Sequence, residues 1–190
     1  MRWNDYGEIE MRYRRADVDG GTYFFTVVTY RRQNIFVDEF AINELRNAIK
    51  EVKQKHPFQI DAWVLLPDHM HCIWTLPKGD DAYSKRMGMI KAKFTSSVKH
   101  MLERDEIKAE SQKAKRESTI WQRRFWEHEI KDEKDFERHV DYIHYNLVKH
   151  GFVNSVIDWP HSTFHRYVDK GIYSHDWAGM VFDESIGFGE

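Results

Sequence analysis

The 190-residue sequence contains one cysteine, four prolines and no long hydrophobic run. A single cysteine, Cys72, excludes an internal disulfide network and a cysteine-only zinc site, and it favours a reducing compartment. The longest apolar runs, 23–28 and 62–66, are far shorter than the roughly 20 residues of a membrane span. The first fifteen residues contain no apolar segment typical of a secretory signal. We therefore expect a soluble, cytoplasmic protein with no membrane partner.

The sequence also lacks a strong net charge. Its formal charge is −2, which by itself argues against a nucleic-acid-binding protein. The charges are unevenly distributed, however, because residues 78–124 contain 13 Lys and Arg but 7 Asp and Glu. A local positive surface can attract a polyanion even on a mildly acidic protein, since distant charges are screened beyond about 10 Å. The alternative, a solvated helix face rich in lysine, stays open.

Phosphate-binding loops, dinucleotide-binding glycine motifs, serine-hydrolase elbows and the H-E-x-x-H zinc motif are all absent. No internal repeat, linker or low-complexity tract divides the chain either. We therefore expect one domain over residues 1–190, with a polar N-terminal arm over 1–20 and a C-terminal tail over 154–190 that is able to contact DNA.

The hydrophobic pattern predicts a regular succession of elements. Runs rich in β-branched and aromatic residues predict strands, and apolar residues at helical spacing predict helices. Strands are expected at 22–30, 58–66, 69–76 and the end of 121–130, and helices at 38–56, 80–104 and 131–148. The order β-α-β-β-α-β followed by a further helix predicts an α+β protein with a ferredoxin-like (RRM-like) antiparallel sheet. Residues 103–118, almost wholly polar, are expected to be a frayed helix end or a loop.

The alternation of the strand 69–76 places His69 and His71 on one face and Met70 on the other. Two residues apart on a strand correspond to roughly 7 Å, close enough for both imidazoles to reach one cation. Imidazole suits first-row divalent ions, and an added oxygen ligand would leave positions open for water or phosphate. Two surface histidines on a half-exposed strand are an equally good interpretation of this pattern alone.

Tyr142 and Asn146 are four residues apart on the helix 131–148, so they share one face. Tyrosine can act as a covalent nucleophile, but its pKa near 10 means that it needs a nearby cation. The carbonyl oxygen of Asn146 is a plausible third ligand for that cation. Tyr145 is the competing nucleophile, although its own i+4 neighbour, Lys149, cannot bind metal. With nine tyrosines in the chain, the better interpretation of both without further context is an aromatic residue at a helix edge.

Basic and aromatic residues alternate from the second helix onward. The candidate phosphate contacts there are Lys91, Lys93, Lys99, Arg123 and Arg124. The interleaved aromatic residues are Phe94, Trp121, Phe125 and Trp126, which are suited to base stacking but more often belong to a core.

In combination these motifs resemble a known family. The segments GGTYFFTVVTYRR (20–32) and LLPDHMHCIWTLP (65–77) resemble the single-tyrosine transposases of the HUH superfamily. WQRRFWEHEIKDEKDFERHVDYIHYNLVKHGFV (121–153) and WPHSTFHRYV (159–168) resemble, more specifically, the REP-associated tyrosine transposases, which are IS200-like. The resemblance covers the chain from about residue 20 to residue 167.

The resemblance implies a metal-dependent endonuclease and strand transferase acting on single-stranded DNA with REP-like hairpins. It implies His69, His71 and Asn146 as ligands of Mg²⁺ or Mn²⁺, and Tyr142 as the nucleophile that forms a 5′-phosphotyrosine link. It also implies DNA contacts from the C-terminal tail, including His165 and Arg166, and a bacterial, nucleoid-associated location. A homodimer and a monomer both stay open.

The sequence departs from the family at Leu147, where a proline is usual, so we expect the helix to continue through this position. Two other functions stay open. One is a catalytically silent protein that binds hairpin DNA and regulates it. The other is a metal-dependent phosphodiesterase that uses water as the nucleophile.

Overall fold

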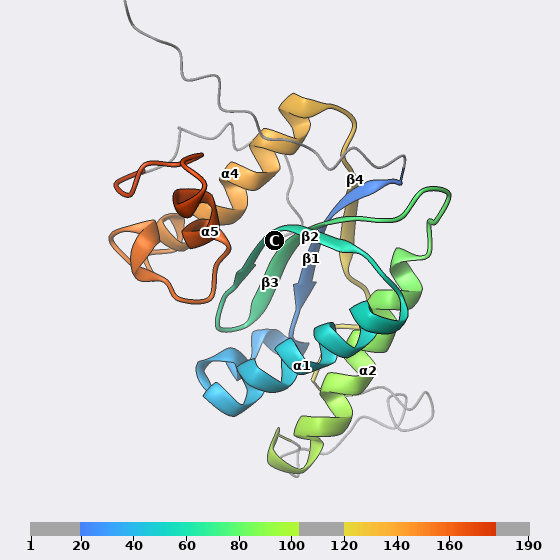
Figure 1. Cartoon of the computed structure of the whole chain (residues 1–190). Coiled ribbons are helices and arrows are strands. Elements are labelled where there is room, and N and C mark those ends of the chain that lie inside the picture. The colour runs from blue at the N-terminus through green and yellow to red at the C-terminus, as the bar shows by residue number, and fades with distance from the viewer. Residues whose placement is uncertain (1–19, 103–119, 178–190) are drawn as a thin grey trace, which may run out of the picture.

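The computed structural model describes residues 20–102 and 120–177 of the chain (Figure 1). Its strands are β1 (Thr22–Val28), β2 (Gln59–Leu65), β3 (His69–Thr75) and β4 (Trp126–Glu129). Its helices are α1 (Glu39–Lys55), α2 (Tyr83–Leu102), α4 (Glu133–Lys149) and α5 (Phe164–Asp169), and short 3₁₀ turns occupy Tyr30–Arg32, Ile35–Val37 and Val156–Asp158. The expected arm lies outside the described residues apart from Gly20, as do the expected loop 103–118 and the last thirteen residues of the tail.

The four strands form one antiparallel sheet in the order β2-β3-β1-β4. Helix α1 connects β1 to β2, and α2 precedes β4, so each helix crosses over the strand that lies between the two it joins. This is the ferredoxin-like arrangement, and it confirms the predicted fold class. The order places β3 in the interior of the sheet, between β2 and β1.

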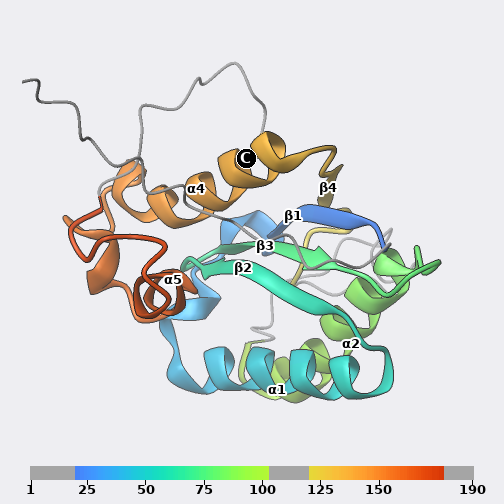
Figure 2. The ribbon, with the colours of Figure 1, turned by 45° about the horizontal axis from the view of Figure 1, so that its top comes forward.

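Helices cover both faces of the sheet. Helices α1 and α2 lie against one face, and α4 with the C-terminal segment lies against the other (Figure 2). Alternate residues of β3 enter the two cores: Met70, Cys72 and Trp74 pack on the α1–α2 side, and Ile73 packs on the α4 side. Every residue of β3 is buried, so His69 and His71 are not surface histidines on a half-exposed strand.

Helix α4 has the sequence features that dock it on the sheet. The Asp132 side chain caps it by accepting a hydrogen bond from the amide of Asp135. The predicted apolar stripe of Phe136, Val140, Ile143 and Leu147 is buried in the core on this side of the sheet. With leucine at position 147, the helix continues to Lys149, as expected.

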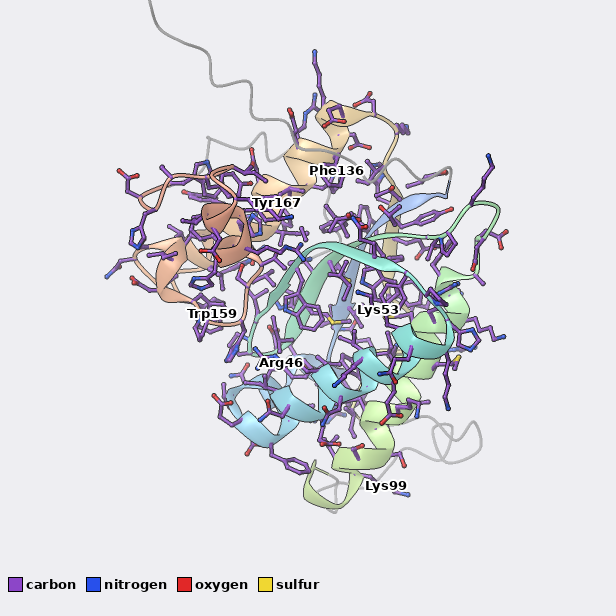
Figure 3. All side chains as sticks on the ribbon, viewed as in Figure 1. Arg46, Lys53, Lys99, Phe136, Trp159 and Tyr167 are labelled. Atoms are coloured by element: carbon purple, nitrogen blue, oxygen red, sulfur yellow. The ribbon has the colours of Figure 1, made fainter. Side chains whose placement is uncertain are left out.

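The C-terminal segment 154–177 is part of the folded structure. Ser162 pairs with Val64 of β2, and the carbonyl of His161 accepts a hydrogen bond from the amide of Leu65. Phe164 and Tyr167 of α5 are buried against the sheet, and Figure 3 shows Tyr167 beside α4, away from α1 and α2. The expected tail is therefore packed against β2 as far as residue 177.

Across residues 20–102 and 120–177, we find no helix with the length and apolar character needed to cross a lipid bilayer.

Candidate active site

The imidazoles of His69 and His71 project together from the α4 side of β3. Their ring centroids are 4.9 Å apart and the rings are nearly perpendicular, at 84°. Both side chains are buried beneath α4. The sheet thus holds two nitrogen donors next to each other in a site shielded from water.

A neighbouring group fixes the Nδ1 atom of each imidazole. Nδ1 of His71 lies 2.9 Å from the hydroxyl of Thr26 on β1, and Nδ1 of His69 lies 2.5 Å from a carboxylate oxygen of Asp68. Nε2 of His69 is buried and has no hydrogen-bond partner within the described part of the chain. Because an imidazole that binds a metal usually places its other nitrogen against such a partner, Nε2 is the atom of each ring that could hold a metal.

Asp68 connects the site to a cation on the surface. Arg32 donates a hydrogen bond to its second carboxylate oxygen at 3.0 Å. Burial raises the pKa of Asp68, but the hydrogen bond and charge of His69, together with those of Arg32, outweigh it and lower the pKa below its ordinary value. The carboxylate is therefore ionised at neutral pH and orients His69.

Helix α4 brings Tyr142 and Asn146 to the histidine pair. The ring of Tyr142 meets that of His71 edge to face, with centroids 5.3 Å apart, and Nδ2 of Asn146 lies 3.4 Å from Nε2 of His71. A 180° turn of the amide would present the Asn146 oxygen there instead, because the two orientations have the same shape. The structure thus brings together all four residues singled out by the sequence.

Tyr145 differs from Tyr142 in its surroundings. Tyr145 is half-buried, whereas Tyr142 is 2% exposed. The ammonium of Lys149, expected beside Tyr145, lies 5.6 Å from the ring centroid of Tyr142. The ring of Tyr142 is in contact with that of His71.

The donors of this site suit a divalent cation. Two imidazole nitrogens and one amide oxygen occupy part of a coordination sphere and leave positions for water or a phosphate oxygen. The unpartnered Nε2 of His69, buried where a polar atom needs a partner, fits such an ion.

The lysines expected to bind DNA lie elsewhere. Lys91, Lys93 and Lys99 are on α2, which covers the opposite face of the sheet (Figures 2 and 3). Lys91 donates to the carbonyl oxygen of Gln122 at 2.6 Å, and Lys93 forms a 2.6 Å ion pair with Glu51 of α1. Lys99 is exposed.

The remaining candidates fall into two groups. Arg123 and Arg124 are exposed in the segment that leads to β4. His165 lies 3.0 Å from the carbonyl oxygen of Trp159, and Arg166 donates to the carbonyl oxygens of Ile60 and Asp61. Arg166 thus holds the C-terminal segment against β2, whereas the His165 contact lies within that segment.

A row of aromatic rings leads outward from His69 and was missed in the sequence. Successive ring centroids lie 6.0–6.3 Å apart along the path His69, His150, Phe152, Trp159 and His161. Arg46 of α1 ends the path 3.0 Å from Nδ1 of His161, and Phe152 is 43% exposed. Most of the row lies in the loop after α4, so its residues follow neither a helical nor a strand period. The one signal in the sequence was the high density of aromatic residues and histidines in this segment.

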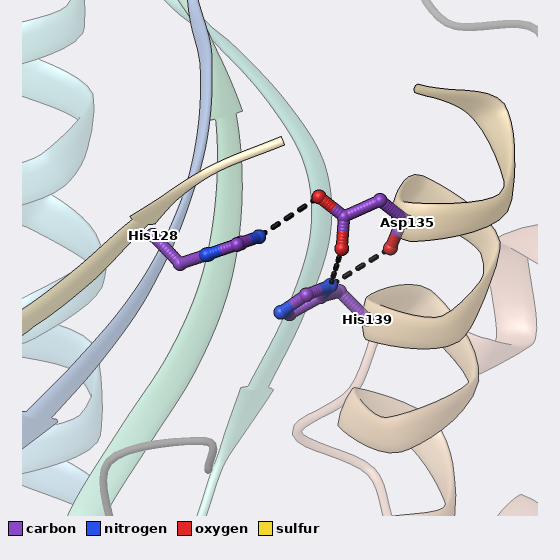
Figure 4. A group of neighbouring side chains, drawn as sticks. All are labelled: His128, Asp135 and His139. Atoms are coloured by element: carbon purple, nitrogen blue, oxygen red, sulfur yellow. Dashed lines mark hydrogen bonds and ion pairs between the residues drawn. The ribbon is translucent and has the colours of Figure 1, made fainter. Parts of the chain in front are cut away.

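A second group of candidate metal ligands was also missed. His128 of β4 and Asp135 and His139 of α4 place three ligand atoms within 4.8 Å of one another (Figure 4). In the sequence, no second candidate ligand lies at a spacing from His128 that is typical of a metal-binding motif. The signal available was the i, i+4 spacing of Asp135 and His139, which puts both on one face of a helix.

Comparisons with known proteins identify the family to which the chain belongs. The family described as "Transposase IS200 like" matches residues 17–146. A REP-associated tyrosine transposase of Escherichia coli (strain K12) is 49% identical over 92% of this chain and 95% of its own length. A putative REP-associated tyrosine transposase of Haemophilus influenzae is 47% identical over 88% of this chain and 93% of its own length.

One solved structure is similar over almost the whole chain. It is described as a REP-associated tyrosine transposase bound to a REP hairpin, and it is 48% identical with a TM-score of 0.74. The match covers 94% of this chain and 96% of that one. The chain therefore belongs to the IS200-like transposase family and, within it, to the REP-associated tyrosine transposases.

Proposed function

We propose that this protein is a metal-dependent single-stranded DNA endonuclease and strand transferase that acts at repeat hairpins. The observation that carries the proposal is the convergence of Tyr142 and Asn146 from α4 on the two histidines of β3. The similar transposase solved with a REP hairpin supports a hairpin as the substrate.

In this proposal, Nε2 of His69, Nε2 of His71 and the side-chain oxygen of Asn146 hold Mg²⁺ or Mn²⁺. The ion, when bound, polarises the scissile phosphate. Tyr142 loses its phenolic proton and its oxygen bonds to phosphorus. The bond from phosphorus to the 3′ oxygen breaks, and that oxygen takes up a proton. The products are a 5′-phosphotyrosine link and a free 3′-hydroxyl, which can later attack the link and reseal the strand.

The aromatic row gives the single strand a path to this site. Bases stack on aromatic rings regardless of sequence, and flanking cations track the phosphates. Phe152 offers an exposed ring, and Arg46 and Arg32 lie at the far and near ends of the row. We propose that nucleotides flanking the hairpin lie along this row, from the site at Tyr142 to Arg46 of α1.

The depth of Tyr142 favours one alternative function. Its hydroxyl is buried, so a phosphate reaches it only if α4 or the loop after it moves when DNA binds. If no such movement occurs, the protein is a catalytically silent regulator that binds hairpin DNA.

A cleavage assay tests both possibilities. Hairpin oligonucleotides with single-stranded flanks are incubated with Mg²⁺ or Mn²⁺, and covalent adducts are separated on a denaturing gel. We expect an adduct from the wild type and from Tyr145→Phe, none from Tyr142→Phe, and none in EDTA. An adduct from Tyr142→Phe would disprove the assignment of the nucleophile. Hairpin binding that persists in EDTA, with no adduct under any condition, would establish the regulator instead.

A further inference from the structure

The cluster of His128, Asp135 and His139 lies apart from the histidine pair of β3. The ring of Phe24 stands between them, with its centroid 4.8 Å from that of His139 and 5.5 Å from that of His71. We refer to His128, Asp135 and His139 as the β4–α4 cluster. It takes no part in the proposed cleavage reaction.

The ligand atoms of the β4–α4 cluster are already close to a coordinating arrangement. Nε2 of His128 lies 2.8 Å from one carboxylate oxygen of Asp135. Nδ1 of His139 lies 3.1 Å from the other carboxylate oxygen and donates a 2.7 Å hydrogen bond to the backbone carbonyl oxygen of Asp135 (Figure 4). The two imidazoles stack with centroids 4.7 Å apart and planes 14° from parallel. Two imidazole nitrogens and one carboxylate oxygen lie close together, and such a set of donor atoms is typical of transition-metal sites.

The surroundings supply both support and an entry path. The ring of Trp126 stacks on that of His128 at 5.9 Å, and Phe24 packs on His139 from the interior. His128 and Asp135 are partly exposed while His139 is buried, so an ion from solvent reaches the cluster from one side. Supporting partners and access are both expected of a working site.

We propose that the β4–α4 cluster binds one divalent transition-metal ion of the Zn²⁺ class through Nε2 of His128, the Asp135 carboxylate and Nδ1 of His139. Nitrogen donors favour such ions over Mg²⁺, so this site differs in selectivity from the site at His69 and His71. Binding replaces the hydrogen bonds within the cluster, and the proton on each coordinating nitrogen moves to the other nitrogen of the same imidazole ring. The ion would fasten β4 to α4 three residues before Tyr142, and it is a positioning element for that helix.

The number of ions bound per chain tests the proposal. Zn²⁺ is measured by equilibrium dialysis and elemental analysis on the wild type, His128→Gln, Asp135→Asn and the control His56→Gln, a histidine outside the cluster. We expect each cluster variant to bind one ion fewer than the wild type, and His56→Gln to match the wild type. This difference does not depend on whether His69 and His71 bind an ion. Equal stoichiometry in all four proteins would overturn the proposal.

Two measurements on the wild type test the proposal even if a cluster variant does not fold. We expect Zn²⁺ to raise the melting temperature more than an equal concentration of Mg²⁺ does. We also expect bound Co²⁺ to shift the imidazole proton resonances of His128 and His139 strongly. Resonances of these two histidines that stay unshifted under saturating Co²⁺ would show that the cluster is held by hydrogen bonds alone.

Discussion

His71 of the interior strand and Tyr142 of helix α4 meet edge to face, with ring centroids 5.3 Å apart. The contact joins residues that are 71 positions apart in the sequence, and Asn146 adds a second link to the same imidazole. Because Tyr142 and Asn146 are on one helix, any displacement of α4 along the sheet moves the phenol and the amide together relative to His71. The position of a single helix thus determines whether the four residues form one site.

Replacing Thr26 by valine should weaken binding of Mn²⁺ at this site. The Thr26 hydroxyl lies 2.9 Å from Nδ1 of His71, and loss of such a supporting partner typically costs about 10- to 100-fold in metal affinity. Mn²⁺ affinity is measured by titration with detection of the free ion by electron paramagnetic resonance. Thr22→Val is the matched control, because Thr22 is on the same strand, is buried and bonds Thr75 instead. Equal affinities for the two variants would contradict the orienting role.

Replacing Phe152 by alanine should weaken binding of the single-stranded flank and leave binding of the hairpin stem unchanged. Removing one stacking ring costs about tenfold in affinity for an oligonucleotide that reaches it. Fluorescence anisotropy compares a hairpin carrying a flank with the same hairpin lacking one. The control is Phe40→Ala, since Phe40 is similarly exposed but lies on α1. If the wild type itself gains no affinity from the flank, the aromatic row is not the path of the strand.

Lys91 should give the folded protein a distinctive pH dependence. Burial lowers the pKa of Lys91 to about 8, whereas in an unfolded chain it is about 10.4. Between these values the unfolded chain binds more protons, so this group makes the free energy of unfolding rise with pH by at most about 1.4 kcal/mol per unit. Urea denaturation at pH 7.5 and pH 9.5 should show a wild type that gains stability relative to Lys91→Met. A constant difference between the two proteins would contradict the shifted pKa.

Replacing Asp80 by asparagine should destabilise the fold. The Arg86 guanidinium is buried and donates to both carboxylate oxygens of Asp80, which together with the Ala82 amide lowers the pKa of Asp80 to about 2. Loss of these charge-assisted hydrogen bonds leaves a buried cation poorly paired, at a cost of about 2 kcal/mol. The control Asp81→Asn changes a neighbouring exposed carboxylate and should have little effect. Urea denaturation at pH 7 compares them, and equal midpoints would show that the pair adds no stability.

Much of the candidate site was predictable because it depends on the side-chain periods of single strands and helices. The strand period placed His69 and His71 on one face, and the helix period placed Tyr142 and Asn146 on another. That these faces meet depends on how α4 docks, which no local pattern encodes. The family resemblance supplied that step, and the structure shows the contact.

The supporting residues could not be found in this way. Thr26 reaches His71 because β1 and β3 pair with these two residues opposite each other, and that register is a property of the sheet. Asp68 is explained in the sequence as a turn residue, yet its side chain turns back onto His69. The ion-pair partner of Lys93 could not be predicted either, because Glu51 belongs to another helix.

Neighbouring residues of the interior strand β3 face opposite sides of the sheet. His71 faces the proposed DNA side, while Cys72, the next residue, lies in the core beneath α1 and α2. Lys53 is exposed on α1, seven residues beyond Arg46, where the proposed path of the strand ends, and α1 covers the face of the sheet opposite α4 (Figures 2 and 3). A fluorophore or surface tether attached there would report on hairpin capture in single-molecule experiments without obstructing it.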